Sequence, residues 1–292
     1  MENKRILVIG GTGFIGMSLV QKLINSNYNV TLLVKKDIFS KNIPSNRALA
    51  PTTCKYFFGD LLDKDSLMKN INNFDLIINL AAIIRTLNKK RYKENIQSIK
   101  NLIEVLDEKK IKKLIYFSTQ SVNLKEKGPY SKSKEVAEKM VRDSNLDYLI
   151  IRPNYVYGID KFNDFYRLAY FIYHFHLAPI IGNGNYKIQP TFKDDLVNIV
   201  FKFIGNFKNK SIIEISGKET TSINEIVETI KENLKIKPII FHIPVTLLRL
   251  FRNFIPFDID GYTEDRISQN PYSDYNFSLF SDNLKKILKL LK

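Results

Sequence analysis

Residues 6–16 read Ile6-Leu7-Val8-Ile9-Gly10-Gly11-Thr12-Gly13-Phe14-Ile15-Gly16. The apolar run over 6–9 predicts a buried strand, and the glycines after it predict a tight turn into a helix that starts near Phe14. Gly11, Gly13 and Gly16 have the spacing G-x-G-x-x-G, in which the glycines permit the turn, let the backbone approach a pyrophosphate and let the helix pack on the strand. Because a helix N-terminus attracts phosphate groups, this stretch predicts a dinucleotide-binding unit.

The composition is that of a globular protein. The chain has 292 residues, of which 44% are hydrophobic and 26% charged, which is enough for one large α/β domain with a smaller lobe. The single cysteine, Cys54, excludes an intrachain disulfide framework. The first apolar run breaks at Gly10, too early for a secretory signal, and no stretch is long enough to span a bilayer. We therefore expect a cytoplasmic protein.

The net charge is strongly positive. Forty-five Lys and Arg against thirty Asp and Glu give a formal charge of +15, which attracts phosphorylated ligands, anionic lipid surfaces or nucleic acid. The lysines are scattered among Asn and Ile, and neither zinc-finger spacing nor an RNP-like aromatic pattern is present. The pattern therefore does not favour a nucleic-acid partner and leaves a phosphorylated small molecule as the expected one.

Strands and helices alternate along the first half of the chain. Apolar runs predict strands over 6–9, 30–34, 55–58, 75–80, 113–118 and 147–152, and helical periodicity fills the segments 14–25, 65–71, 92–108 and 130–143. This alternation predicts an α/β fold with a Rossmann-type, doubly wound parallel sheet covered on both faces. We assign residues 1–153 to this dinucleotide-binding domain.

The second half is less regular. From 162 to 190 the chain is richer in aromatics, Gly and Pro, while 211–215 and 222–233 predict a further strand and an amphipathic helix with a Ser or Thr cap. We assign residues 154–292 to a smaller C-terminal substrate-binding lobe that interleaves with the sheet.

Tyr130 and Lys134 stand four residues apart in a predicted helix, which places both side chains on one face. A lysine ammonium beside a phenol lowers the pKa of the phenol, so Tyr130 is a candidate general acid or base. The pair follows the strand that ends in Ser118 and Thr119, and the ligand crevice of an open α/β sheet lies at such strand ends. A strand-end cap is the alternative role for Thr119.

The motifs of the chain occur in a fixed order: the glycine-rich turn, Gly59-Asp60-Leu61, Asn79-Leu80-Ala81-Ala82, Asn95 through Asn101-Leu102, Phe117-Ser118-Thr119, Tyr130 with Lys134, and Arg152-Pro153-Asn154-Tyr155-Val156-Tyr157-Gly158. Together they resemble the extended or atypical short-chain dehydrogenase/reductase superfamily, and within it the NAD-dependent epimerase/dehydratase family. The resemblance covers most of the chain.

The resemblance implies a role for each of these residues. Tyr130 would exchange a proton with a substrate hydroxyl or carbonyl oxygen that Thr119 also holds, while Lys134 would bind the nicotinamide ribose and depress the phenol pKa. The nicotinamide would carry the hydride. Asp60 and Leu61 would lie at the adenine end, although Asp60 as a plain turn residue stays open. The implied cofactor contacts are Gly10, Gly13, Phe14, Ile15, Gly16, Asp60, Leu61, Ala81, Ala82, Asn95 and Pro153.

The residues after the second predicted strand bear on the choice of cofactor. An acidic residue there usually accepts the ribose hydroxyl of NAD, whereas a basic one pairs with the 2′-phosphate of NADP. Lys35 and Lys36 follow Val34, so NADP is favoured over NAD, with Lys35 as the contact. An exchangeable NADPH fits a reductase, and a tightly held NAD fits an epimerase.

For the substrate, the resemblance implies a nucleotide-linked sugar bound by Asn154, Lys187 and Gln189. Related proteins commonly have an arginine where this chain has Ile188, and Lys187 supplies a point charge rather than a bidentate fork. The Gln189-Pro190 form is similar to atypical members such as the NADPH-binding accessory subunits of respiratory complex I. A non-catalytic dinucleotide-binding protein is therefore the alternative to an enzyme.

Further features bear on metals and partners. His174, His176 and His242 lack metal-like partners in the sequence, and we expect no metal site. The segment 241–257 is apolar with two arginines; we expect it to be buried in the substrate lobe, and contact with a membrane surface is the alternative. The resemblance also implies a homodimer through the long helices.

Overall fold

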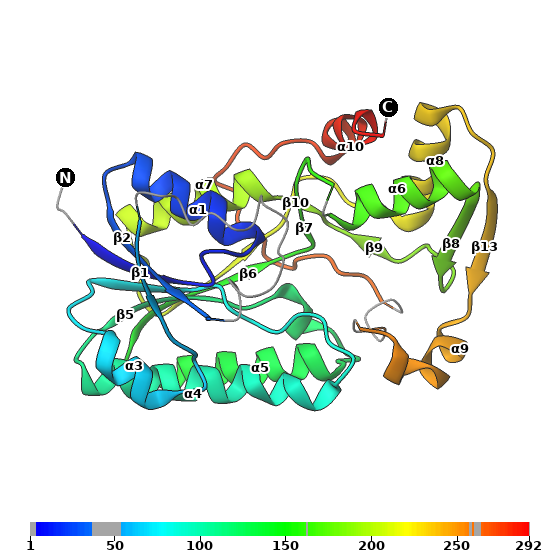
Figure 1. Cartoon of the computed structure of the whole chain (residues 1–292). Helices are drawn as coiled ribbons and strands as arrows, with labels where there is room; N and C mark the ends of the chain where they lie inside the picture. Colours follow the sequence, from blue (N-terminus) through cyan, green and yellow to red (C-terminus); the bar gives the residue numbers. More distant parts are fainter. Residues whose placement is uncertain (1–3, 37–53, 162, 257–258, 260–263, 292) are drawn as a thin grey trace.

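The computed structural model describes residues 4–36, 54–161, 163–256, 259 and 264–291. Within them, seven parallel strands form the central sheet in the order β11-β6-β5-β4-β1-β2-β3 (Figure 1). The strands are β1 (Arg5–Ile9), β2 (Asn29–Val34), β3 (Lys55–Phe58), β4 (Leu76–Asn79), β5 (Lys113–Phe117), β6 (Asp147–Pro153) and β11 (Ser211–Ile215). The predicted fold class is confirmed, and each predicted strand lies within one or two residues of its expected place.

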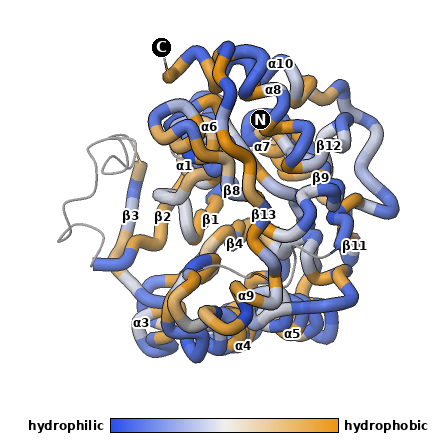
Figure 2. The backbone as a smooth tube through the Cα atoms, turned by 90° about the vertical axis from the view of Figure 1, so that its right-hand side faces the viewer, coloured by the Kyte–Doolittle hydropathy of each residue, from blue (hydrophilic) through white to orange (hydrophobic). Residues whose placement is uncertain are grey.

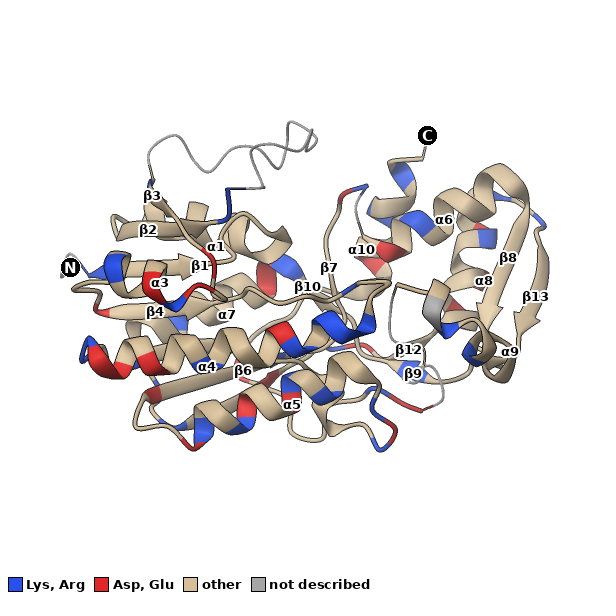
Figure 3. Ribbon diagram, turned by 60° about the horizontal axis from the view of Figure 1, so that its bottom comes forward, with Lys and Arg blue, Asp and Glu red and all other residues tan. Residues whose placement is uncertain are grey.

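Helices cover both faces of this sheet. On one face lie α1 (Phe14–Asn25) and α7 (Lys193–Gly205), and on the other α3 (Lys64–Asn70), α4 (Lys93–Glu108) and α5 (Pro129–Arg142) (Figure 1). Strands buried on both faces form near-continuous apolar runs because each side chain meets a helix, and Figure 2 shows this apolar interior. The outer surfaces of α4 and α5 carry charges of both signs (Figure 3).

The second lobe has its own core. It contains α6 (Asp164–Phe175), α8 (Ile223–Leu234), α9 (Val245–Leu250), α10 (Phe280–Lys289) and the parallel pair β8 (Leu177–Ile181) and β13 (Ile239–Ile243). Short two-residue strands complete it: β7 (Val156–Tyr157), β9 (Lys187–Ile188), β10 (Thr191–Phe192) and β12 (Thr221–Ser222). At its centre the rings of Tyr157, Phe165 and Phe280 pack edge to face. Because α7 and β11 return to the central sheet, the chain passes between the two bodies more than once.

The order of the strands positions the site. From β1 the chain proceeds outward through β2 and β3, then returns to β4 beside β1 and proceeds outward the other way through β5 and β6. The sheet therefore has a switch point between β1 and β4, and a crevice opens beyond the carboxyl ends of the strands there. Three short 3₁₀ segments lie on loops: Lys89–Tyr92, Gln120–Asn123 and Arg252–Phe254.

One expectation about packing is wrong. The segment 241–257 was expected in the core, but α9 buries none of its residues, and Leu250 and Phe254 are each 79% exposed. The segment runs from β13 through α9 to the 3₁₀ turn (Figure 2), and within the described part of the chain no further layer covers α9. Phe257 lies outside the described residues.

Candidate active site

A cavity of about 580 Å³ lies beyond the carboxyl ends of β1, β4, β5 and β6, between the two lobes. It brings together side chains and backbone from distant parts of the sequence. Of the predicted site residues, those that line it are Gly10, Gly13, Phe14, Ile15, Gly16, Ala81, Ala82, Thr119, Tyr130, Lys134, Pro153 and Asn154.

The glycine-rich turn forms one wall of the cavity and has no room for side chains. Gly10 has φ +82°, and a Cβ there would lie 2.8 Å from the backbone nitrogen of Ala81. A Cβ on Gly16 would lie 2.2 Å from the carbonyl oxygen of Gly10. Gly13 precedes α1 without a side-chain cap, and the first turn of α1 holds no acidic residue. An anion such as a pyrophosphate therefore fits at this helix end, where backbone N–H groups lack helical partners.

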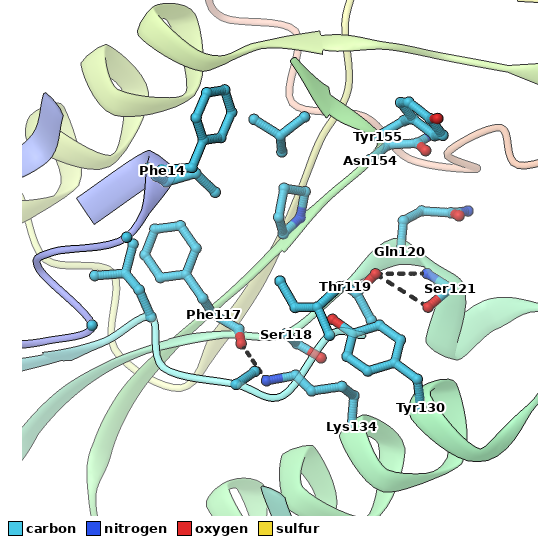
Figure 4. A pocket seen from close by; sticks show the side chains of 18 of the residues that line it. Phe14, Phe117, Ser118, Thr119, Gln120, Ser121, Tyr130, Lys134, Asn154 and Tyr155 are labelled. Carbon is cyan, nitrogen blue, oxygen red and sulfur yellow. Dashed lines mark hydrogen bonds between the residues drawn. The ribbon is translucent and has the colours of Figure 1, made fainter. Parts of the chain in front are cut away.

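Tyr130 and Lys134 extend from the first turns of α5 toward the end of β5 (Figure 4). Lys134 is 2% exposed; its Nζ donates a hydrogen bond of 2.6 Å to the Phe117 carbonyl and lies 4.2 Å from the centroid of the Tyr116 ring. Burial lowers the pKa of Lys134 from 10.5 to about 7, while the charge of Glu138 opposes this change. The ammonium is therefore fixed at the inner wall of the cavity, one helical turn from the phenol.

Thr119 caps the 3₁₀ turn Gln120–Asn123 and also lines the cavity. Its Oγ1 accepts a hydrogen bond from the Ser121 backbone N–H and lies 3.2 Å from Ser121 Oγ, to which Ser131 donates in turn (Figure 4). Two further side-chain oxygens beside it, Ser118 Oγ and Gln120 Oε1, are buried and have no hydrogen-bond partner among the described residues. Because an unsatisfied buried polar atom is costly, these two atoms fit a site that a polar ligand completes.

We expect the buried ammonium of Lys134 to cost stability at neutral and lower pH. Between pH 7 and 10.5 the unfolded chain binds more protons than the native one, so this cost is full below pH 7 and fades as the pH rises through that window. Replacing Lys134 with Met should raise the free energy of unfolding by about 2 kcal/mol at pH 6, since the gain exceeds the one lost hydrogen bond.

Urea unfolding of the nucleotide-free protein and of Lys134→Met at pH 6 and pH 10 measures this difference. The gain should shrink at the higher pH. A variant that is less stable than the native protein at pH 6 would show that Lys134 is buried as a satisfied group instead.

The structure places four predicted cofactor residues outside the cavity lining. Lys35 Nζ forms an ion pair of 2.8 Å with Asp60, both about half-exposed at the ends of β2 and β3. Burial raises the pKa of Asp60, but the hydrogen bonds from Lys35 and the Leu62 N–H and the charge of Lys35 outweigh it, so the net shift is downward. Leu61 is buried, and its carbonyl accepts a hydrogen bond from Asn101.

Asn95 is the fourth, and its contacts identify it as a positioning residue. Its side chain accepts a hydrogen bond of 2.8 Å from the Ile83 N–H and donates to the Ile83 carbonyl and to Ser133 Oγ. These bonds tie the loop after β4 to α5, so Asn95 holds the wall formed by Ala81 and Ala82 in place relative to Tyr130.

Two predicted substrate residues do not reach the cavity. The ammonium of Lys187 pairs with Glu225, which belongs to the capping box of α8. The Gln189 amide is buried, donates to the Gly217 carbonyl and accepts from the Ser268 N–H. Lys187 in β9 and Gln189 just after it therefore both have their polar groups engaged in contacts outside the cavity.

Arg85, Gln120 and Arg266 are among the cavity residues that escaped the sequence analysis. Arg266 forms a β-bridge with Ile188, and its N–H donates to the Lys187 carbonyl, so this arginine lies beside the position where related proteins were expected to have one. Asn154 donates to the Arg266 carbonyl over 2.7 Å. Because 78 residues separate Ile188 from Arg266, no local pattern links them. Arg85 pairs with Asp164 at the start of α6, across the two lobes.

The described residues also bear on metal binding and on membrane insertion. No group of three or more His, Cys, Asp or Glu in them is arranged to hold a metal ion. No helix among them is long and apolar enough to cross a membrane.

Comparisons with known proteins agree with this architecture. The model of the NAD-dependent epimerase/dehydratase family matches residues 6–216, and the chain belongs to this family. A Methanocaldococcus jannaschii protein named "Putative UDP-glucose 4-epimerase" is 28% identical over 258 residues, which cover 78% of this chain and 82% of that protein. The N-acetyl-alpha-D-glucosaminyl-diphospho-ditrans,octacis-undecaprenol 4-epimerase of Escherichia coli O157:H7 is 24% identical over 266 residues, covering 84% and 77%.

A solved structure shows the same fold. The crystal structure of UDP-glucose 4-epimerase with UDP-glucose from Thermotoga maritima has a TM-score of 0.76 and 20% identity to this chain and covers 98% of this chain and 97% of that one.

Proposed function

We propose that the protein is an NAD(P)-dependent oxidoreductase or epimerase that acts on a hydroxyl or carbonyl of a diphosphate-linked sugar. The observation that carries the proposal is that Thr119, Tyr130 and Lys134 line the same cavity as the glycine-rich turn. A dinucleotide whose pyrophosphate sits at the start of α1 extends along the strand ends toward these three side chains.

The residues fit a nicotinamide cofactor, and their roles follow from their chemistry. A nicotinamide cofactor held in the cavity would supply hydride transfer to or from the sugar carbon. Tyr130 would take the proton from the reacting hydroxyl and give it back to the carbonyl oxygen, and Thr119 Oγ1 would donate a hydrogen bond to that oxygen. Lys134 would hold the cofactor ribose and stabilise the phenolate by its charge.

The scarcity of carboxylates in the cavity favours epimerisation or carbonyl reduction over dehydration. Among the described residues that line it, Asp164 alone is acidic, and it is engaged by Arg85, by Arg167 at 3.7 Å and by the Tyr155 hydroxyl at 3.5 Å. Elimination of water from a sugar needs a base for the carbon-bound proton and an acid for the leaving hydroxyl, in addition to the group that serves the oxidised oxygen. Epimerisation needs one acid–base group and an oxidised sugar that rotates in the site, so that the hydride returns to its opposite face.

The diphosphate is the part of the substrate for which the cavity has the clearest partner. Arg266 supplies a planar fork that suits phosphate oxygens. Gln120 and Asn154, which line the same cavity, suit sugar hydroxyls (Figure 4). Relatives act on UDP-linked and on undecaprenyl-diphosphate-linked sugars according to their names, and both substrates share this diphosphate.

We expect replacement of Arg266 with Ala to raise KM for a diphosphate-linked sugar about 10- to 100-fold and to change kcat less, because a charge-assisted contact contributes about 1.5–3 kcal/mol. Steady-state kinetics of this variant and of Arg142→Ala, an exposed arginine at the end of α5, measure the effect. An unchanged KM in Arg266→Ala would remove Arg266 from the substrate site.

NADP is the preferred cofactor in this proposal, and the cytoplasm its location. Lys35 lies at the end of β2, as expected for a partner of the 2′-phosphate, and its pairing with Asp60 holds the ammonium at the edge of the sheet. The reducing cytoplasm suits a chain with a single cysteine. Cys54 is half-buried, and burial raises the pKa of its thiol to about 11.

The proposal is tested by incubating the protein with NAD and a panel of UDP-glucose, UDP-N-acetylglucosamine and UDP-glucuronic acid, and with NADPH and a UDP-linked keto sugar. Products are resolved by chromatography and their stereochemistry by NMR. We expect an epimerised or reduced product from at least one member of the panel. Tight dinucleotide binding with no turnover of any diphosphate-linked sugar would indicate the non-catalytic alternative.

A further inference from the structure

The segment that carries Arg266 has almost no regular secondary structure of its own. Arg266 meets Ile188 in an isolated β-bridge, and its N–H donates to the Lys187 carbonyl over 2.7 Å. The residues on either side of this bridge, 264–265 and 267–270, lie in neither a helix nor a strand. Such a backbone keeps one conformation only where other groups satisfy its N–H and C=O groups. The place of Arg266 at the cavity therefore depends on contacts from outside its own segment.

Three buried amide side chains supply such contacts. We call them the amide clamp; its members are Gln120, Asn154 and Gln189, which are 2–8% exposed. Asn154, directly after β6, donates from Nδ2 to the Arg266 carbonyl over 2.7 Å. Gln120, in the 3₁₀ turn after β5, donates from Nε2 to the carbonyl of the next residue, Ile267, over 3.1 Å. Two consecutive carbonyls are thus held by donors at the carboxyl ends of β5 and β6.

Gln189, just after β9, holds the third residue of this run. Its Oε1 accepts a hydrogen bond from the Ser268 N–H over 3.2 Å, while its Nε2 donates to the Gly217 carbonyl over 2.8 Å. The Ser268 hydroxyl also forms a hydrogen bond with the hydroxyl of Ser216, and both serines are buried. Gln189 does not line the cavity, so any effect it has on a ligand there must pass through the segment that carries Arg266.

We propose that the members of the amide clamp are positioning residues that hold Arg266 where it binds the diphosphate of the sugar substrate, an inference that rests on the proposed function. A side chain whose backbone is already fixed loses less conformational freedom when it binds a ligand, so the ligand binds more tightly. Gln120 directly follows Thr119 in the chain. The clamp therefore also joins the diphosphate contact to the residue that would face the reacting oxygen.

The test is calorimetric titration of the full-length protein with UDP as the diphosphate probe, with NAD and NADP in excess so that UDP does not occupy the glycine-rich turn. The variants are Gln189→Met, Arg266→Ala and the two combined. Methionine keeps about the size of glutamine and removes both of its hydrogen bonds. The matched control is Asn283→Leu, a buried amide of α10 that donates to the Tyr157 hydroxyl over 3.0 Å in the core of the second lobe.

We expect Gln189→Met to weaken UDP binding about 3- to 10-fold, the range that neutral hydrogen bonds control, and to leave dinucleotide binding within about twofold. In the Arg266→Ala background the same substitution should have no further effect, because the clamp acts through Arg266. The inference is overturned if Gln189→Met binds UDP as the native protein does, if its effect persists without the arginine, or if Asn283→Leu loses as much affinity. Native affinity in Arg266→Ala alone would instead overturn the proposed diphosphate contact.

Ser216→Ala decides the matter should Gln189→Met be unable to fold. This smaller substitution removes only the hydroxyl contact with Ser268, and Ser216 does not line the cavity. UDP binding should weaken about two- to threefold, and only in the protein that retains Arg266. Unchanged UDP binding in Ser216→Ala would then count against the clamp.

Discussion

Replacing Tyr130 with Phe should lower kcat about 10²- to 10⁴-fold and leave the dissociation constant of the cofactor within about twofold, the range expected for the loss of a general acid–base group. The ring remains, and with it the packing against Tyr92 at 5.9 Å between centroids, so the cavity keeps its shape. Only the hydroxyl that would exchange a proton with the substrate is lost. The measurement is steady-state turnover of the identified substrate, together with a cofactor titration of the same preparation.

The matched control is Tyr92→Phe. The Tyr92 hydroxyl donates to the Ile84 carbonyl over 3.1 Å, outside the reacting centre, so its loss should cost about 1 kcal/mol of stability and little kcat. If Tyr130→Phe retains full turnover, Tyr130 is not the proton-exchanging group. If both variants lose turnover equally, the loss does not single out the Tyr130 hydroxyl as the proton-exchanging group.

Replacing Gly16 with Ala should weaken dinucleotide binding about 100-fold or more and lower the stability of the protein. The added Cβ would meet the Gly10 carbonyl oxygen at 2.2 Å and the Cα of Gly11 at 2.8 Å, and all of these atoms are backbone. No side-chain rotation relieves such a contact, so the turn must shift, at a cost of about 1–3 kcal/mol for overpacking. The shift also displaces the N–H groups that would face the pyrophosphate.

Gly205→Ala is the control for this substitution. Gly205 ends α7, and nothing lies within 4 Å of a Cβ placed there. Alanine in a helix is favoured over glycine by about 0.5–1 kcal/mol, so this variant should be as stable as the native protein or slightly more so and should bind the cofactor normally. Normal cofactor binding in Gly16→Ala would contradict the assignment of the glycine-rich turn.

The sequence was most informative where local pattern and function coincide. The apolar strands and the glycine spacing predicted the sheet because each inner strand is covered by helices on both faces. The strand order then brings Thr119, Tyr130 and Lys134 to one end of the sheet. In the second lobe no comparable burial of both strand faces determines where a side chain points. Lys187 and Gln189 lie near the expected segment, yet their polar groups are engaged in packing contacts.

Contacts between segments that are distant in the sequence could not be predicted from local sequence patterns. Arg266 joins the cavity through a bridge to Ile188 that no periodicity in either segment reveals. The segment 241–256 has the composition of a core, and composition cannot tell whether another layer covers it. In the structure Leu250 and Phe254 are each 79% exposed, so among the described residues no further layer covers them.

The proposed nicotinamide dinucleotide in the cavity beside Tyr130 is tested most directly by identifying the bound nucleotide. A fresh preparation is denatured and any released nucleotide identified by mass spectrometry, and the nucleotide-free protein is then titrated with NAD, NADH, NADP and NADPH. We expect one dinucleotide per chain, with NADP(H) bound more tightly than NAD(H) because of Lys35. Retained NAD would correct the role of Lys35 and favour an epimerase, whereas a protein that binds none of the four would contradict the claim.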